Sequence, residues 1–333
     1  MKIKVMLSNS FDPYFNLATE EWIFRHIDLE GPVLFLWRNE NTVVIGRFQN
    51  PWSECDLEKM EKDHIHLARR QSGGGAVFHD LGNTNFTFLN PSESFNREIN
   101  NQIIIKALAK FKVKAYASGR NDLLVGGKKI SGSAFKEIKG RSFHHGTLLI
   151  DTDLTKLGRY LVPREKKLAS KGIRSVRSRV MNLKEEAPLI SHDLICKAII
   201  EEFSKKYGQS CEVETLDLNF LSHQPSFMKS YEKLKDWHWR IGETPKFEQS
   251  FDEQFSFGSM EVFLNSHKGV ITEIKIFSDG LHPEMIEYLN RAFLGISYHP
   301  EAVGLACDNI AQELPMFKDY IEEFRSWFCS CLS

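Results

Sequence analysis

The sequence of 333 residues lacks most features that mark secreted, membrane or nucleic-acid-binding proteins. Its six cysteines are scattered and follow no CxxC or Cys/His spacing, which excludes a disulfide scaffold and a zinc site. No apolar run approaches the roughly 18 residues of a membrane helix, and no signal-peptide core stands at the start. A formal net charge of -1 gives no general attraction to nucleic acid or membranes. We therefore expect a reduced, cytoplasmic protein that binds neither.

The composition that remains is that of an ordinary globular protein, with 42% hydrophobic and 26% charged residues and no repeats. Apolar runs at 33–37 and 42–46 predict buried strands, and alternation at 85–89 and 145–151 predicts two more. Helices are expected from Asn16 to residue 27, at 102–111, and from a Ser191 cap to Gly208. The pair Gly126 and Gly127 predicts a hairpin turn.

A second, smaller unit is predicted after residues 242–247, where turn-forming residues gather. The run 270–277 predicts a strand that places Val270, Thr272, Ile274 and Ile276 on one face. Helical patterns follow at 283–293 and 307–327. We therefore predict an α/β (α+β) chain with a mixed-sheet domain at 1–245 and a C-terminal α+β accessory domain at 246–333.

The segment from Arg69 to Asp80 is the sharpest feature, because it places two arginines shortly before three consecutive glycines, with Gln71 and Ser72 between them. Glycines in a row are costly in regular structure, but they let backbone amides approach an anion. Arginine pairs add bidentate donors for phosphate or carboxylate. The segment is neither a P-loop nor a GxGxxG fingerprint. An anion site is favoured, and a plain turn between strands is the alternative.

A second group combines Asp122 with Lys129 and a Ser-Gly-Ser turn that follows the lysine. A lysine beside hydroxyls and mobile amides suits a carboxylate and a phosphate that are being joined, because it neutralises their repulsion. Asp122 is a candidate to hold Mg²⁺ at the phosphates. A hairpin with solvated lysines explains this segment equally well.

His144 and His145 precede an apolar run, but neighbours in a strand point to opposite faces, so we reject a shared metal ion. Residues 166–184 contain seven basic residues and no acidic one. This stretch indicates a loop that closes over a polyanion such as a nucleotide. It holds no aromatic residue on which a base could stack, which argues against nucleic acid. A solvated basic loop is the alternative.

Several of these segments resemble the motifs of bacterial lipoate–protein ligase A, in the same order. They are residues 69–88, 117–123, 129–135, 143–149 and 171–180, with further similarity at 33–39, 42–47 and 49–52. The resemblance covers nearly the whole chain, including the accessory domain. It implies the mixed-sheet catalytic fold shared by lipoate and biotin ligases.

The resemblance also implies a two-step reaction. Lipoate and Mg-ATP give lipoyl-AMP and pyrophosphate, and the ε-amine of a carrier lysine then takes the lipoyl group and releases AMP. The implied cofactors are ATP and Mg²⁺, with lipoate as substrate. The implied carriers are lipoyl domains of 2-oxoacid dehydrogenase complexes and the glycine cleavage H protein, served by a monomeric enzyme.

The family pattern assigns roles to individual residues. It places Lys129 at the carboxyl and phosphate of lipoate and its adenylate, as the catalytic residue that contacts both substrates. Together with Lys129, the implied ATP-binding residues are Arg70, Gly75, Ala76, Val77 and Phe78. The loop that also lines the lipoyl site comprises Ser72, Gly73 and Gly74. The implied adenylate-binding loop comprises Lys171, Gly172, Ile173, Arg174, Ser175, Val176, Arg177, Ser178, Arg179 and Val180.

Gln71 departs from the pattern, because relatives carry a small or basic residue there, and only that side-chain contact is in doubt. An octanoyl transferase that uses a cysteine nucleophile is disfavoured, since no cysteine lies between Cys55 and Cys196. Two alternatives stay open. One is a transferase that accepts preformed lipoyl-AMP without making it, and the other is a protein that only binds lipoate or a nucleotide.

Overall fold

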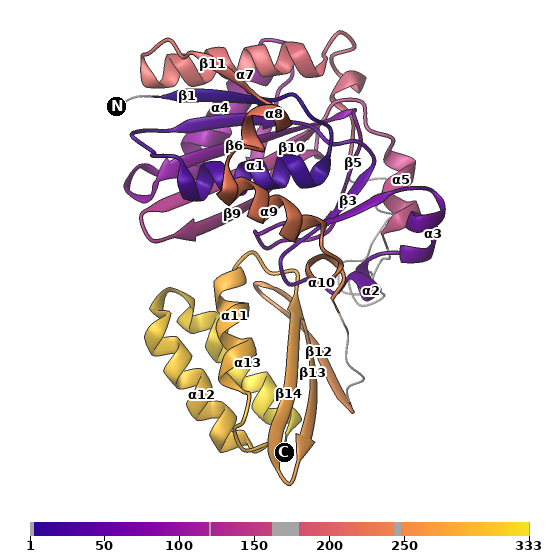
Figure 1. Ribbon diagram of the computed structural model, residues 1–333, viewed down its shortest axis with the longest axis vertical. Coiled ribbons are helices and arrows are strands. Elements are labelled where there is room, and N and C mark those ends of the chain that lie inside the picture. Colours follow the sequence, from indigo (N-terminus) through magenta and orange to yellow (C-terminus); the bar gives the residue numbers. More distant parts are fainter. Residues whose placement is uncertain (1–2, 120, 162–179, 243–247, 333) are drawn as a thin grey trace. The chain divides into compact units, whose positions relative to one another are not determined.

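The computed structural model describes residues 3–119, 121–161, 180–242 and 248–332. The chain divides into two compact units (Figure 1). The larger unit comprises Met1–Ile45, Pro51–Gln71 and Ala76–Ile241, and the C-terminal unit comprises Gly46–Asn50, Ser72–Gly75 and Gly242–Ser333. The division at 245/246 stays a prediction, since 243–247 lie outside the described residues.

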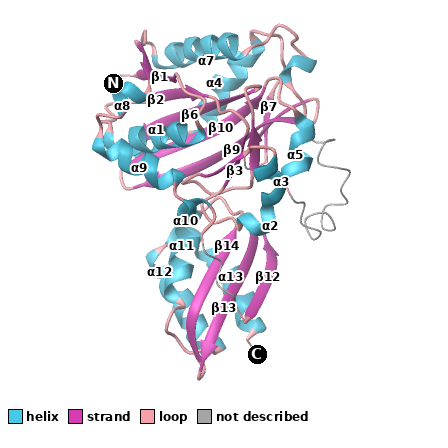
Figure 2. Ribbon diagram, turned by 45° about the vertical axis from the view of Figure 1, so that its right-hand side comes forward, coloured by secondary structure: helices cyan, strands magenta, loops and turns pink. Residues whose placement is uncertain are grey.

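The larger unit is built on a mixed sheet of eight strands (Figure 2). In spatial order the strands are β11 (Val213–Leu216), β1 (Lys4–Ser8), β2 (Val33–Trp37), β6 (Asn83–Pro91), β10 (Arg141–Leu149), β9 (Lys128–Ile138), β8 (Asp122–Val125) and β7 (Tyr116–Ser118). Strand β1 runs parallel to β2 and β11, whereas the other pairs are antiparallel. A small sheet pairs β3 (Thr42–Ile45) with β4 (His66–Arg69) and β5 (Val77–His79). The predicted mixed-sheet α/β class is confirmed.

Helices cover both faces of the large sheet and also pack beside the small one. They are α1 (Pro13–His26), α2 (Pro51–Glu54), α3 (Leu57–Lys62), α4 (Arg97–Ala109), α5 (Leu154–Tyr160), α7 (His192–Tyr207), α8 (Leu218–Leu221), α9 (Pro225–Lys235) and α10 (Trp237–Arg240), with short 3₁₀ turns at Ser92–Ser94 and Leu183–Glu185. Leu34 and Leu36 of β2 pack in one core with α4 and α7, whereas Phe35 and Trp37 pack in the other with α1 and α9. Both faces of β2 are buried, which explains its continuous apolar run. None of the described helices is long and apolar enough to span a membrane.

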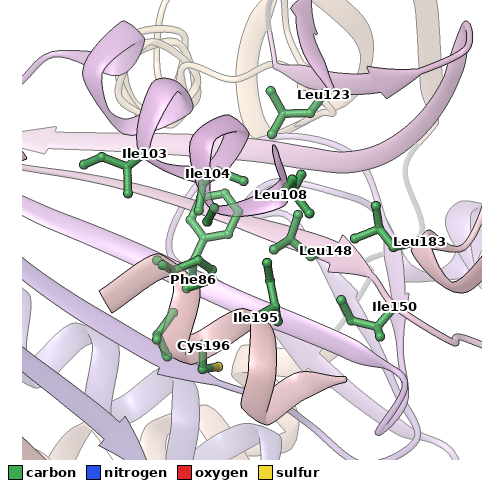
Figure 3. Packing of buried hydrophobic residues seen from close by; sticks show 14 of the residues in the cluster. Phe86, Ile103, Ile104, Leu108, Leu123, Leu148, Ile150, Leu183, Ile195 and Cys196 are labelled. Carbon is green, nitrogen blue, oxygen red and sulfur yellow. The ribbon is translucent and has the colours of Figure 1, made fainter. Parts of the chain in front are cut away.

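Figure 3 shows the core between the sheet and helices α4 and α7. Ile103, Ile104 and Leu108 of α4 approach Phe86 and Leu148 of the sheet. Helix α7 follows the predicted boundaries, since Ser191 accepts a hydrogen bond from the Leu194 N–H and Gly208 ends the helix at φ 65°. Local capping chemistry therefore fixes where this core helix begins and ends.

The predicted cap of the first helix is wrong. Helix α1 begins at Pro13, and Asp12 is its N-cap, because its carboxylate accepts from the Tyr14 N–H at 2.8 Å. Asn16 is buried inside the helix, and its amide donates to the carbonyl oxygens of Ser10 and Arg38. A proline at the first helical position fits this earlier start.

The C-terminal unit pairs a three-stranded antiparallel sheet with helices. Its elements are β12 (Gln249–Phe255), β13 (Gly258–His267), β14 (Val270–Ser278), α11 (Pro283–Ala292), α12 (Pro300–Glu313), a 3₁₀ turn at Pro315–Phe317 and α13 (Lys318–Cys331). The helix expected at 307–327 is two helices, which Pro315 separates, because proline cannot continue a helix.

The face predicted for β14 is also wrong in part. A bulge opposite Asn265 and Ser266 leaves Thr272 without a partner, so Ile271, Ile274 and Ile276 share the core-facing side. Ile271 is fully buried and Val270 is exposed. One extra residue in a strand reverses the alternation beyond it.

Gly146 on β10 is a position where any side chain should destabilise the fold. A Cβ there would lie 2.4 Å from the ring of Phe86, which is its partner on β6. We expect Gly146→Ala to lower the free energy of unfolding by about 1–3 kcal/mol through overpacking. Urea unfolding of the purified chain measures this loss. Gly158→Ala in α5, where a Cβ meets nothing within 4 Å, is the control and should not destabilise. Equal midpoints for both variants would contradict the prediction.

Candidate functional site

Arg69 ends β4 and fastens it to α10. Its Nε donates to the carbonyl oxygen of Trp239 at 2.8 Å and its Nη2 to that of Arg240 at 2.9 Å. The Trp239 indole N–H donates back to the Arg69 carbonyl oxygen at 3.0 Å. The Arg69 side chain therefore donates hydrogen bonds to carbonyl groups at the C-terminus of α10, where a helix leaves backbone acceptors unpaired. The sequence paired Arg69 with Arg70 as an anion donor, but its observed contacts are structural.

Arg70, by contrast, lies inside the larger unit with 6% of its surface exposed. Its backbone N–H donates to Ile45 and its Nη1 donates to the Val44 carbonyl at 3.2 Å. Burial lowers the pKa of the Arg70 guanidinium to about 10, and the nearby charge of Glu20 opposes this shift. The side chain is therefore a buried cation held against the edge of β3.

A buried polar cluster surrounds Arg70, and the sequence did not single it out. Glu20, which is 3% exposed, accepts from Thr87 Oγ1 at 2.7 Å and contacts His145 Nδ1 at 2.8 Å. Burial, followed by the charges of Arg70 and His145, lowers the pKa of His79 to about 3. A buried glutamate in the middle of a helix was the available signal, since Glu is rarely buried unless paired.

The two adjacent histidines do point to opposite faces of β10, as predicted. His145 meets Glu20, whereas the His144 ring packs 4.6 Å from that of Phe135 and beside Phe86. They cannot share one ion. Among the described residues, no group of three or more His, Cys, Asp or Glu side chains could hold a metal.

Gln71, the departure from the family pattern, is buried in this region, with 9% of its surface exposed. Its side-chain amide donates to Glu21 Oε2 at 3.3 Å, and its backbone carbonyl oxygen accepts from Lys136 Nζ at 3.3 Å. Its side chain is therefore engaged by α1, which explains why a polar amide is accommodated there.

Lys129 and Asp122 are brought together on the β8–β9 hairpin. The Lys129 Nζ lies 2.7 Å from Asp122 Oδ1, with 36% and 34% of the two side chains exposed. The predicted turn is confirmed, since Gly126 and Gly127 both have positive φ. These two predicted site residues therefore form a half-exposed ion pair.

The end of the predicted adenylate-binding loop also meets Lys129. Val180 forms a parallel bridge with Lys129, and the Met181 N–H donates to the Lys129 carbonyl oxygen at 3.0 Å. Residues 171–179 lie outside the described residues. The backbone of Lys129 thus anchors the chain where this loop ends.

The glycine run joins β4 to β5, and its first part belongs to the C-terminal unit. There the Gly74 N–H donates to the Gly280 carbonyl oxygen at 3.0 Å, and Gly74 has φ 92°. A Cβ on Gly73 would lie 2.2 Å from the same oxygen, so only glycine fits. Close backbone approach explains these two glycines without an anion.

The last part of the run enters β5 of the larger unit. Val77 pairs with Val44 and Phe78 with Val43, and Phe78 is buried. Gly75, in the C-terminal unit, has nothing within 4 Å of an added Cβ. The nucleotide-binding role of Gly75 to Phe78 and the lipoyl-binding role of Ser72 to Gly74 stay predictions.

Comparisons with known proteins agree with this arrangement. The model of the lipoyl protein ligase A/B catalytic domain matches residues 12–204, and that of the bacterial lipoate protein ligase C-terminus matches 244–328. A lipoate-protein ligase A of Bdellovibrio bacteriovorus is 49% identical over 332 residues, which cover 98% of either chain.

Three solved structures are also similar. LipL1 of P. falciparum in complex with lipoate superposes with a TM-score of 0.87 at 37% identity, over 99% of this chain and 100% of that one. A bipartite archaeal ligase of Thermoplasma acidophilum, studied with its E2 lipoyl domain, gives 0.65 at 29%, over 75% and 100%. A lipoate-protein ligase A bound with ATP gives 0.63 at 28%, over 73% and 99%.

Both family models, the whole-length identity and the structural similarity confirm the resemblance found in the sequence. The chain belongs to the lipoate–protein ligase A family.

Proposed function

We propose that the chain joins lipoate to carrier lysines through an adenylate formed at Lys129. In the first step a lipoate carboxylate oxygen attacks the α-phosphorus of ATP, and pyrophosphate leaves. In the second step the ε-amine of the carrier lysine attacks the carbonyl carbon of lipoyl-AMP. An amide forms, AMP leaves, and the amine loses a proton. As a member of this family, the chain is a ligase that uses lipoate and ATP.

The observation that carries this proposal is the position of Lys129. Its ammonium is half-exposed on the β8–β9 hairpin, and its backbone contacts the chain at Val180 and Met181, where the predicted adenylate-binding loop ends. A cation placed where a carboxylate and a phosphate meet lowers their repulsion and stabilises the charge of the transition state. Lys129 therefore acts as an electrostatic group, and no covalent nucleophile is required.

We also propose roles for the other residues that the resemblance implies. We assign Arg70 and Gly75 to Phe78 to the nucleotide, Ser72 to Gly74 to the lipoyl group, and Lys171 to Val180 to the adenylate. The burial of Arg70 supports its assignment to the nucleotide, because a cation shielded from water attracts a phosphate more strongly than a solvated one.

The Asp122 carboxylate is a suitable ligand for Mg²⁺. Magnesium is commonly held by one or two carboxylates together with substrate phosphates, and Asp122 supplies one partly exposed carboxylate on the hairpin. Bound there with ATP, the ion would neutralise phosphate charge. Asp122 is the residue that we assign to it.

The buried thiols argue against the cysteine-dependent octanoyl transfer. Burial raises the pKa of Cys55, Cys196 and Cys307 to about 12 each, so none provides a thiolate nucleophile. None of the six cysteines forms a disulfide, which supports a reducing compartment, and we propose the cytoplasm.

We propose lipoyl domains of 2-oxoacid dehydrogenases and the glycine cleavage H protein as carriers. The support is the archaeal relative studied with an E2 lipoyl domain. We also propose that the enzyme acts as a monomer, because Lys129, Asp122 and Arg70 all lie in one unit of a single chain.

Lipoate-dependent exchange of labelled pyrophosphate into ATP tests the function. We expect exchange in the presence of Mg²⁺ and its loss with a chelator, because the first step is reversible and uses Mg-ATP. Transfer from added lipoyl-AMP without exchange would identify a transferase that lacks the activation step. Lipoate binding with neither reaction would identify a binding protein. Both outcomes would overturn the ligase.

A further inference from the structure

A bulge in β9 determines which residue lies beneath the Lys129 side chain. Asp122 pairs with Gly132 and Leu123 with Ser131, but Leu124 pairs with Lys129, so Ile130 is the extra residue. In a regular strand, Lys129 would share a face with Ser131 and lie opposite Gly132. The bulge brings Gly132, instead of Ser131, onto the face that carries Lys129 and Asp122.

Gly132 leaves space for the lysine side chain on that face. A Cβ at this position would lie 2.9 Å from Lys129 Nζ and 3.0 Å from its Cε. The Lys129 chain therefore passes directly over Gly132 on its way to the Asp122 carboxylate. The Gly132 N–H donates to Thr147 Oγ1 of β10 at 3.2 Å, which ties this point to the sheet.

Asp122 is itself fixed by its neighbour. The Ser133 N–H donates to the Asn121 carbonyl oxygen at 2.8 Å, and the Asn121 amide donates to the Ser133 carbonyl oxygen at 3.0 Å. This double contact holds the start of β8 opposite Gly132. The backbone at Asp122 is thus held by contacts that do not involve Lys129.

We infer that Asp122 and Gly132 form a resting seat for Lys129, from which an anionic substrate must displace the ammonium. The inference rests on the proposed role of Lys129. Asp122 is then a positioning residue, which orders a long flexible side chain before the substrate arrives. A partly exposed lysine–carboxylate pair contributes at most about 1 kcal/mol, so the substrate can break it.

If Lys129 rests against Asp122, the effect of removing the Asp122 carboxylate on ligand affinity should depend on the charge of the ligand. In Asp122→Asn, the Lys129 ammonium has no carboxylate partner to give up when lipoate binds. We expect lipoate to bind about two- to fivefold more tightly, the ratio that corresponds to the strength of such a pair. Lipoamide carries no carboxylate, so its affinity should not change.

Isothermal titration of lipoate and lipoamide without nucleotide or Mg²⁺ measures both affinities. Glu201→Gln is the matched control, because it removes a carboxylate on helix α7 that pairs with Lys110 at the C-cap of α4. It should change neither affinity. In a Lys129→Met background, Asp122→Asn should no longer tighten lipoate binding, which shows that the carboxylate acts through the lysine.

Unchanged or weaker lipoate binding by Asp122→Asn would contradict the inferred resting position of Lys129. An equal gain in the affinity for lipoamide would contradict it as well. A carboxylate that serves only Mg²⁺ predicts no change for either ligand in metal-free buffer. Pyrophosphate exchange by the wild-type chain tests the proposed function separately. If Asp122→Asn binds lipoate more tightly but the wild-type chain shows no exchange, the inference about Asp122 and Gly132 stands and the proposed ligase function is rejected.

Discussion

Replacing Lys129 with alanine is expected to lower lipoate-dependent pyrophosphate exchange by about 10²- to 10³-fold, the loss typical when a preorganised charge-stabilising group is removed. The fold should survive, because the side chain is half-exposed and its backbone pairing with Leu124 does not need the ammonium. Initial rates of exchange at saturating ATP, with the circular dichroism spectrum as a check on folding, measure both expectations.

Lys128 provides the matched control for this variant. It precedes Lys129 on the same strand, is exposed, and has only a distant partner in Glu185, 3.9 Å away. Lys128→Ala removes the same charge from the same hairpin, so exchange should stay near that of the parent. Near-parent exchange by Lys129→Ala, or an equal loss in both variants, would reject the assigned role.

Features that depend on neighbours along the chain could be predicted from the sequence. The Ser191 cap and the Gly208 stop of α7, the Gly126–Gly127 turn and the opposite faces of His144 and His145 all follow from local geometry. The association of Lys129 with Asp122 could also be anticipated, because a tight hairpin brings the two strands together.

Features that depend on strand irregularities could not be predicted from the sequence. A regular alternation would place Lys129 on the face opposite Gly132, and only the bulge at Ile130 brings them together. The bulge at Thr272 of β14 caused the same kind of error for Val270. Nothing in the residue types announces an extra residue, because bulges are set by the pairing of both strands.

Long-range contacts were equally hidden. Gly73 must be glycine because the carbonyl of Gly280 approaches it, and Arg69 is engaged by the carbonyls of Trp239 and Arg240. The sequence suggested an anion for both positions. A glycine run and an arginine pair have the same appearance whether they face a phosphate or a distant part of the backbone.

Acid is expected to destabilise the larger unit well above the pH at which its carboxylates are protonated. Burial lowers the pKa of His79 and His144 to about 3 and that of His192 to about 4. In an unfolded chain each histidine has a pKa near 6.5. Between these values only the unfolded state takes up the proton, so stability is complete above about pH 6.5 and falls as the pH falls.

Each such histidine removes up to about 1.4 kcal/mol per pH unit once the pH is well below its unfolded pKa, and the three together cost about 3 kcal/mol between pH 6.5 and 5.5. Urea unfolding across this range measures the slope. His144 lies among Phe86, Phe88 and Phe135, so His144→Phe keeps an aromatic ring there and removes the titrating group. Its slope should fall by about a third, since one of the three equal contributions is lost. His238→Phe changes an exposed histidine on α10 and should leave the slope of the parent. A parent chain with equal stability at both ends of the range would refute the expectation, because buried neutral histidines must accept protons when the chain unfolds.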